Sequence, residues 1–458
     1  MKAPRRMARV EVVRAGPGIE TAKARLLADV LSAFEGYGHP YCVMHGYTGY
    51  TDQIPSDVDL VSSDPSGVPR ILLASGVARM VQAIEHEAGA LRYILHRDEG
   101  CCHTFLALDA SSDFRGDGRI FLAATEVLGN SRIWKDMRIP APDVEFGYML
   151  VKGIGKSALT DSRCLRLVET YREAPTRCEW RVRALFPRSD AALIIEACRS
   201  EHWAQVRSDL ARLRRSMLRR WGQARPGNVI AYWAGDAKRR LRRALHPTGM
   251  MVIVLGPDGV GKTSVIREVE RALAPAFRST RQYHLRPRFG RGPAGTGVVA
   301  DPHGSPPRGP LLSCAKVAFW LADYYISYLI DILPRLIRST LVLFDRHYCD
   351  ILVDPRRYRY GGPGWLAGML SRWTFLGNPV VICLDAPEDV ILERKREVSR
   401  EEITRQREAY RRLAGRLPRS HVVDAARPLA DVAADVTRIV LDALTARTAA
   451  RLGLGSDP

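Results

Sequence analysis

The eight residues at positions 256–263 have the types and the spacing that bind phosphate groups. They read Gly-Pro-Asp-Gly-Val-Gly-Lys-Thr, which is a glycine, four further residues and then Gly-Lys-Thr. The glycines let the backbone curl so that its N–H groups point at phosphate oxygens. The ammonium of Lys262 can reach the β- and γ-phosphates of ATP, and the hydroxyl of Thr263 can hold Mg²⁺. The alternative is a glycine-rich turn that carries an unrelated lysine.

The segments on either side of this loop are those that the motif requires. An unbroken apolar run at residues 250–255 is typical of a buried parallel strand, and residues 264–273 have the apolar spacing of a helix. The helix would add the positive end of its dipole to the amides of the loop. We therefore expect ATP to contact seven residues of the loop and of the helix start: Gly256, Gly259, Val260, Gly261, Lys262, Thr263 and Ser264.

Further strand-like runs in this half of the chain end in an acidic residue. The apolar run at residues 341–345 ends in Asp345, and similar runs cover residues 380–385 and 421–424. In a parallel sheet the ligand lies at the carboxyl ends of the strands. Asp345 is therefore expected to face the Mg²⁺ region, and Arg346 the phosphates. A cationic segment after the third run could close over the phosphoryl group that is transferred.

These pieces resemble the thymidylate kinase-like branch of the nucleoside monophosphate kinases. The matching segments follow the order of that family: residues 256–263, Asp-Arg-His-Tyr at 345–348, Leu-Asp-Ala-Pro-Glu at 384–388, the cationic segment at 394–400, and Arg-Gln-Arg-Glu-Ala-Tyr at 405–410. The resemblance implies an ATP loop, an acidic loop residue that contacts the sugar of the acceptor, an Asp-Arg pair between the two substrates, and a cationic lid. It carries these roles to Asp258, Lys262, Thr263, Asp345, Arg346, Arg394, Lys395, Arg396 and Arg400.

The half of the domain that would hold the acceptor departs from that family. Thymidylate kinases have Arg-Glu-Pro-Gly-Gly-Thr after the second strand, where this chain has Tyr-His-Leu-Arg-Pro-Arg at residues 283–288. We therefore expect an acceptor other than dTMP, namely a small nucleotide or a related phosphorylated or hydroxylated metabolite. Arg286, Arg356 and Arg357 could hold its phosphate or carboxylate through forked hydrogen bonds, or they could form a structural salt-bridge network.

A second set of acidic residues lies nearer the amino terminus. Asp57 and Asp59 are two apart on an expected strand, so their side chains share one face, and Asp109 ends another strand-like run. His-Gly at residues 45–46 and Ser-Asp-Val-Asp-Leu at 56–60 resemble the polymerase-beta-type nucleotidyltransferase fold, although a tyrosine stands where that family has a second small residue. The resemblance implies that the three acids hold Mg²⁺. The alternatives are solvated acids in a strand-end turn and a degenerate domain that binds nucleotide without chemistry.

The chain is expected to fold as an α/β protein in three blocks and a tail. The amino-terminal block has strand-like runs and a helical pattern over residues 71–87, which predicts an α+β nucleotidyltransferase-like domain. A basic helical connector follows, and then the P-loop domain, a parallel sheet flanked by helices. In that last block, residues 290–310 are rich in glycine and proline and are expected to form a loop. The expected boundaries are 1–145, 146–246, 247–447 and, for the tail, 448–458.

The composition of the chain indicates classes of binding partner but no particular partner. The 458 residues carry a net charge of +19, which suits phosphate-rich ligands or an anionic surface, and equally a chain from an arginine-rich proteome. The arginine-rich helices expected over residues 199–243 predict either a contact with an anionic surface or a solvated connector. The most apolar window, residues 311–333, contains three charged residues, which predicts a buried helix and no transmembrane segment. Nine cysteines without a Cys-x-x-Cys pair predict reduced thiols and a cytoplasmic location.

Three functions fit these features. The first is an ATP-dependent kinase that acts on a small acceptor. The second is nucleotidyl transfer by the amino-terminal block, with the kinase-like block as its nucleotide-binding partner. The third is an NTP-binding module without enzymatic activity. The residues do not select the acceptor, the pathway or the oligomeric state.

Overall fold

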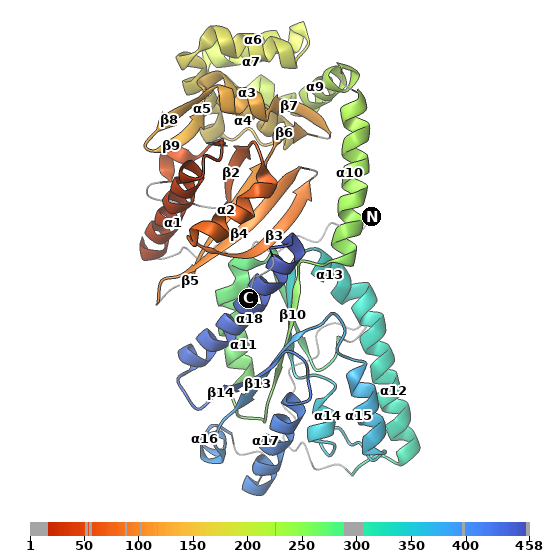
Figure 1. Ribbon diagram of the computed structural model, residues 1–458. Helices are drawn as coiled ribbons and strands as arrows, with labels where there is room; N and C mark the ends of the chain where they lie inside the picture. The colour runs from red at the N-terminus through yellow and green to blue at the C-terminus, as the bar shows by residue number, and fades with distance from the viewer. Residues whose placement is uncertain are drawn as a thin grey trace. The chain divides into compact units, whose positions relative to one another are not determined.

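The chain forms two compact units. A computed structural model describes residues 17–50, 54, 57–87, 89–100, 103–116, 118–224, 226–287, 306–395 and 399–454. The first unit comprises Met1–Arg239 and the second Arg240–Pro458. Each unit combines helices with a five-stranded sheet, as the sequence predicts for an α/β protein (Figure 1).

The first unit is built on a mixed sheet with the strand order β1-β2-β5-β4-β3. β2 and β5 run parallel, and the other neighbours run antiparallel. Helices α1 (Pro17–Gly36) and α2 (Val68–Ser75) contact each other, and α1 also contacts β5. The strands are β1 (Tyr41–Val43), β2 (Asp57–Ser62), β3 (Arg79–Glu87), β4 (Ala90–Asp98) and β5 (His103–Ser111).

One strand of this sheet replaces part of an expected helix. The sequence pattern predicts a helix over residues 71–87, but α2 ends at Ser75 and β3 begins at Arg79. Gly76 ends the helix because it takes a left-handed conformation, with φ at 63°, in which its N–H bonds to the carbonyl of Leu73. The helical prediction is wrong for this segment because pairing of β3 with β4 outweighs the local pattern.

The rest of the first unit is mainly helical, and it shares a core with the sheet. Buried Cys42 and Val61 of the sheet, Leu167 and Leu213 belong to one hydrophobic cluster. The elements in chain order are β6 (Asp113–Gly116), β7 (Arg119–Ala123), α3 (Ala124–Gly129), β8 (Ser131–Trp134), β9 (Met137–Pro140), α4 (Pro142–Gly155), α5 (Asp161–Glu173), α6 (Pro175–Leu185), α7 (Arg188–Ser200), α8 (Ala204–Ser208), α9 (Leu210–Ala224) and α10 (Pro226–Leu245).

This shared core differs from the expected division of the chain. The sequence predicts a domain that ends at residue 145 and a separate connector over 146–246. In the structure, the helices that follow residue 145 complete the core of the first unit, and the boundary between the units falls at Arg239, inside α10. The reason is that their apolar faces pack against strands from earlier in the chain, which local periodicity does not reveal.

The second unit is built on the parallel sheet that the sequence predicts. Its strand order is β11-β12-β10-β13-β14, and all four pairings among these strands are parallel. β10 is buried along its whole length, which explains its unbroken apolar run. The strands are β10 (Met250–Leu255), β11 (Ser279–His284), β12 (Thr340–Asp345), β13 (Val380–Asp385) and β14 (Ser420–Asp424).

Helices flank this sheet (Figure 1). α11 and α18 contact each other, while α12 and α17 contribute Trp320 and Tyr410 to a buried cluster with Met251 and Ile253 of β10. The elements are α11 (Lys262–Leu273), the 3-10 turn Ala274–Ala276, α12 (Pro310–Ser327), the π-helical turn Tyr328–Ile332, α13 (Leu333–Ile337), α14 (Asp350–Val353), α15 (Gly364–Arg372), α16 (Glu388–Arg394), α17 (Arg400–Ala414) and α18 (Leu429–Leu452).

Two details of this unit differ from expectation. α12 is expected to be buried, yet its outer side exposes large apolar residues, among them Leu312, Phe319 and Ile326. The expected tail from residue 448 is helical as far as Leu452, with Thr448 buried, because α18 continues to that point. Most of the expected loop, residues 290–305, lies outside the described residues. Within the described part of the chain, no helix combines the length and the apolar character needed to cross a membrane.

Candidate functional site

The loop between β10 and α11 has a curled backbone, as the sequence predicts. Gly256, Gly259 and Gly261 have φ values of 142°, 86° and 103°, a region that residues with a side chain rarely adopt. A Cβ atom at Gly256 would also lie 2.5 Å from the carbonyl oxygen of Leu384 on β13. Glycine at this position is therefore required both by the backbone conformation and by the neighbouring strand.

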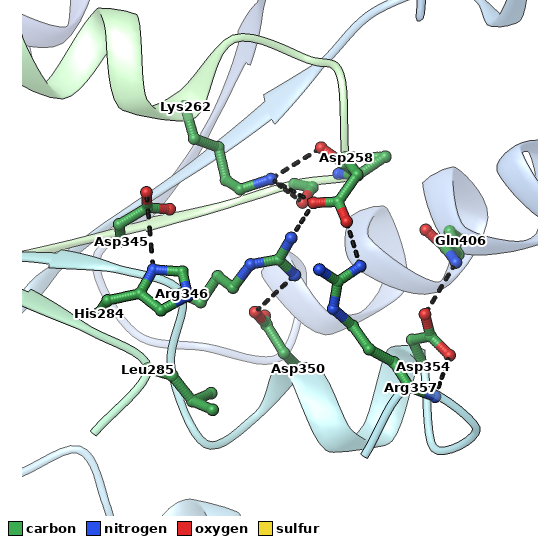
Figure 2. Close-up of polar contacts among 12 residues, drawn as sticks. Asp258, Lys262, His284, Leu285, Asp345, Arg346, Asp350, Asp354, Arg357 and Gln406 are labelled. Carbon is green, nitrogen blue, oxygen red and sulfur yellow. Dashed lines mark hydrogen bonds and ion pairs between the residues drawn. The ribbon is translucent and has the colours of Figure 1, made fainter. Parts of the chain in front are cut away.

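Lys262 lies inside the curl of this loop. It is the first residue of α11, and 7% of it is exposed. Its Nζ donates hydrogen bonds of 2.8 Å to the carbonyl oxygens of Gly256 and Pro257, and Oδ1 of Asp258 is 3.5 Å away (Figure 2). Burial lowers the pKa of Lys262, although the charge of Asp345 opposes this shift. The ammonium group is therefore held by weak acceptors that a phosphate could replace.

Thr263 and Asp345 lie side by side because β10 and β12 are parallel neighbours that end at the same edge. The Thr263 hydroxyl donates a 2.9 Å hydrogen bond to Oδ2 of Asp345. The buried Oδ1 of Asp345 has no hydrogen-bond partner among the described residues. Burial disfavours the charged carboxylate, but the imidazole of His284, the charge of Lys262 and the Thr263 hydroxyl outweigh it, so the pKa of Asp345 lies below its usual value. A carboxylate with a spare oxygen beside a hydroxyl fits Mg²⁺.

Two guanidinium groups converge on Asp258, the acidic residue of the loop. Arg346 and Arg357 each donate a hydrogen bond to one of its carboxylate oxygens (Figure 2). Arg346 follows Asp345 directly and takes a left-handed backbone conformation, with φ at 72°. That turn brings the Arg346 side chain beside the loop. The structure therefore groups the candidate residues of the loop with those of the β12 end.

A buried carboxylate beside this group, that of Asp350, is not predicted by the sequence motifs. Asp350 begins α14, is 1% exposed, and has an oxygen 3.8 Å from Nη1 of Arg346. Burial raises the pKa of Asp350 to about 6, although the charges of Arg346 and Lys262 oppose the shift. In the sequence, Asp350 is marked only by its spacing of four residues from Arg346. That spacing indicates a contact only when the positions of β12 and α14 are known.

The arginines expected to hold an acceptor are mostly in ion pairs. Arg357 contacts Asp258, and Arg286 donates a 3.1 Å hydrogen bond to Asp323. Arg356 is exposed. Arg286 and Arg357 thus make the contacts of a salt-bridge network, and a ligand carboxylate or phosphate would compete with these acidic partners.

The cationic segment after β13 is divided between two places. Nη1 of Arg394 donates a 3.3 Å hydrogen bond to the carbonyl oxygen of Val260 in the loop. Arg400 instead pairs with Asp389 at an exposed position, and Arg396 lies outside the described residues. The structure therefore brings Arg394 to the loop and does not bring Arg400 there. A cavity of about 220 Å³ beside the loop is lined by residues that include Val260, Gly261, Ser264 and Arg394.

The three acids of the first unit also come together. Asp57 and Asp59 lie on β2, and Asp59 is directly opposite Asp109 of β5 in the parallel register. All three line a cavity of about 590 Å³. The sequence predicts this grouping from the two-residue spacing and the strand-end position.

Each of these acids has a cationic partner within the first unit. Arg92 of β4 donates to Asp109 from Nε at 2.7 Å and also donates to Asp57. Lys152 of α4 donates to Asp59. In the described part of the chain, no group of three acidic, histidine or cysteine residues has a spacing that could hold a metal ion. Because Arg92 and Lys152 already pair with the three carboxylates, the residues as placed do not fit the Mg²⁺ site that the resemblance implies.

Comparisons of this chain with protein-family models and with curated proteins find no match.

Proposed function

We propose that the second unit is an ATP-dependent kinase that transfers the γ-phosphoryl group of ATP to a small phosphorylated or hydroxylated acceptor. The observation that carries this proposal is the convergence of Lys262, Thr263 and Asp345 at one edge of the parallel sheet, beside a curled glycine loop. Phosphoryl transfer needs positioned donors and cations that neutralise the phosphate oxygens, and little covalent chemistry from the protein. These residues have that chemistry.

Different groups of the loop would bind different parts of ATP–Mg²⁺. Its N–H groups and the start of α11 would bind the phosphates, and Lys262 would exchange the carbonyl oxygens of Gly256 and Pro257 for phosphate oxygens. Mg²⁺ held by Thr263 and Asp345 would supply further neutralisation of the phosphate charge. The spare buried oxygen of Asp345 supports this assignment.

The acceptor would lie near the carboxylate of Asp258. The resemblance to thymidylate kinase-like proteins gives this residue a contact with the acceptor, and Arg346 and Arg357 already meet there. An acceptor with an anionic group would compete with Asp258 for the two guanidinium groups, which favour forked contacts with phosphate or carboxylate. The class we propose is therefore an anionic small nucleotide or metabolite, with dTMP not expected.

The proposal is tested by a screen that measures ADP and pyrophosphate separately. The full chain is incubated with ATP, Mg²⁺ and nucleoside monophosphates, nucleosides or sugar phosphates. We expect ADP with one class of acceptor, and a loss of at least roughly a hundredfold in Lys262→Ala. Lys238→Ala, at an exposed lysine of α10, is the matched control and should behave as the parent.

Two patterns of turnover in this screen would contradict the proposal. One is ADP formation at the parental rate in Lys262→Ala. The other is pyrophosphate release that is lost in Asp57→Asn and kept in Lys262→Ala, which would favour nucleotidyl transfer by the first unit. The cationic partners of Asp57, Asp59 and Asp109 do not favour that second candidate. Binding of ATP with no turnover for any acceptor would indicate an NTP-binding module.

A further inference from the structure

The first unit contains a cavity that is separate from the proposed kinase site. We propose that Arg92 acts there as a built-in cation in the place of a divalent metal, so that the cavity takes an anionic ligand without Mg²⁺. The ligand class is a small phosphate- or carboxylate-bearing molecule with an apolar part. This inference does not depend on the activity of the second unit.

The backbone, and not only a flexible side chain, sets the position of Arg92. In the antiparallel pairing of β4 with β5, Arg92 is directly opposite Asp109, which in turn is opposite Asp59. Arg92 reaches Asp109 with two hydrogen bonds, from Nε at 2.7 Å and from Nη2 at 2.8 Å, and Nη2 also donates to Asp57. Such forked pairs between guanidinium and carboxylate are among the strongest and most directional side-chain contacts. Arg92 therefore bridges two of the three acids.

The third acid is held by a different cation. Lys152 donates to Asp59 and also donates a 2.7 Å hydrogen bond to the hydroxyl of Tyr148. Nε2 of His45 lies 2.9 Å from Asp59. A divalent ion between Asp57 and Asp109 would have to displace Arg92, whereas one at Asp59 would have to displace Lys152 or lie within a few ångströms of its positive charge. The fixed side chains thus provide the neutralisation that metal ions would otherwise provide.

Cationic side chains also line the cavity from the helices. Lys156, Arg163 and Arg214 line the cavity from the end of α4, from α5 and from α9, whereas the three acids line it from the sheet. Among the described lining residues there are six arginines and lysines and five acids, and three of the acids, Asp57, Asp59 and Asp109, already have cationic partners. The charge that faces a ligand from the helices is therefore positive.

The cavity also offers aromatic surface and sufficient room. Phe114 and Tyr148 line it, and their rings pack edge to face with centroids 4.5 Å apart. Its volume of about 590 Å³ falls in the range of roughly 300–1,000 Å³ that is usual for small-molecule sites. An anion with an apolar or aromatic part, such as a nucleotide, matches both the cations and the rings.

The proposal that Arg92 takes the place of a divalent metal is tested by counting the Mn²⁺ ions that the protein binds. Mn²⁺ is titrated into the full chain without nucleotide, and free Mn²⁺ is measured by electron paramagnetic resonance. We expect the parent, Asp57→Asn and Asp109→Asn to bind the same number of ions. Arg92→Met should gain one site, and Arg92→Met with Asp57→Asn should lose it again.

A parental Mn²⁺ site that disappears in Asp57→Asn or Asp109→Asn would overturn the inference, whether or not the Arg92 variants fold. A folded Arg92→Met protein that gains no site would also contradict it, because Arg92 would then not be what excludes the metal.

The proposal that the cavity binds an anionic ligand without a metal is tested by ligand binding to the Lys262→Ala chain. In this variant the loop of the second unit lacks its lysine. ATP, pyrophosphate and citrate are the probes, and equilibrium dialysis is done in EDTA and again in Mg²⁺. We expect ATP, the probe that has an aromatic part, to bind equally well in both conditions, and Arg163→Met or Arg214→Met to weaken its binding by roughly tenfold. Arg412→Met, at an exposed arginine of α17 paired with Glu408, is the control. Binding of none of the probes, or binding only with Mg²⁺, would overturn the inference.

Discussion

Asp350 is ionised only at a pH well above the usual range of a carboxyl group. It is buried beside Arg346, and its pKa is raised to about 6 because burial outweighs the attraction of Arg346 and Lys262. In the unfolded chain this pKa would be near 3.9. The folded protein therefore holds this proton more tightly. Its contribution to stability is fully present below about pH 4 and is lost as the pH rises through about 6.

Asp350→Asn should remove this pH dependence. We expect the free energy of unfolding of the second unit to fall less between pH 4 and pH 7 in the variant than in the parent, by up to about 3 kcal/mol. The measurement is urea unfolding followed by tryptophan fluorescence at several pH values. Glu408→Gln, at an exposed position, should leave the parental slope unchanged. The same slope in Asp350→Asn and the parent would contradict the assignment.

The sequence predicts the local motifs of the candidate site but not its long-range contacts. Lys262 and Thr263 follow from an eight-residue pattern, and Asp345 from its place at the end of an apolar run. The pairing of Arg357 with Asp258 joins residues 99 positions apart in the chain, and that of Arg92 with Asp57 joins residues 35 apart. Such contacts depend on the order of strands and on the path of loops, which periodicity alone does not determine.

The loop after β10 has little freedom to vary in sequence. Gly256 has φ at 142°, and an added Cβ would lie 2.5 Å from the carbonyl oxygen of Leu384. The contact with β13 therefore excludes a side chain at position 256, as does the backbone conformation of the loop itself. The sequence predicts β10 and β13 with their observed bounds because both are buried apolar runs, and it misses β3, where the helical pattern continues past Gly76.

Gly256→Ala is predicted to disturb this loop. The added methyl group needs a shift of the loop or of β13, so we expect the Mg²⁺-dependent affinity for ATP to fall at least roughly tenfold. Gly368→Ala in α15 is the matched control, since an added Cβ there meets nothing within 4 Å. It should stabilise the unit by about 0.5–1 kcal/mol. Titration calorimetry and thermal unfolding measure the two effects, and unchanged ATP affinity in Gly256→Ala would contradict the account.

Arg394 is the residue of the cationic segment that the structure brings to the loop. Arg394→Met should weaken Mg²⁺-dependent ATP binding by roughly five- to tenfold, because a charge next to the phosphates is lost. Arg400→Met should bind ATP as the parent does, since Arg400 pairs with Asp389 away from the loop. Calorimetry on both variants distinguishes them, and a larger loss in Arg400→Met than in Arg394→Met would reverse the roles of the two arginines.

At the scale of the whole molecule, the chain combines two compact units that each have a candidate ligand site. The net charge of +19 gives both sites a background that attracts anions, and this attraction weakens as salt rises. Since each candidate site is formed by residues of one unit, substitutions in the two sites are expected to act independently.

Asp57→Asn should therefore leave ADP formation by the full chain within about twofold of the parental rate. The coupled assay for ADP, run with the acceptor found in the screen, measures this directly. Loss of ADP formation in Asp57→Asn would show that the two sites depend on each other.

Hydrogen–deuterium exchange of the peptide that spans residues 256–273, measured with and without ATP and Mg²⁺, directly tests our claim that this loop binds the phosphates of ATP. If the amides of the loop and of the start of α11 hold the phosphates, their exchange should slow in the parent and remain unchanged in Lys262→Ala. Equal exchange in the parent with and without saturating ATP and Mg²⁺ would contradict the claim.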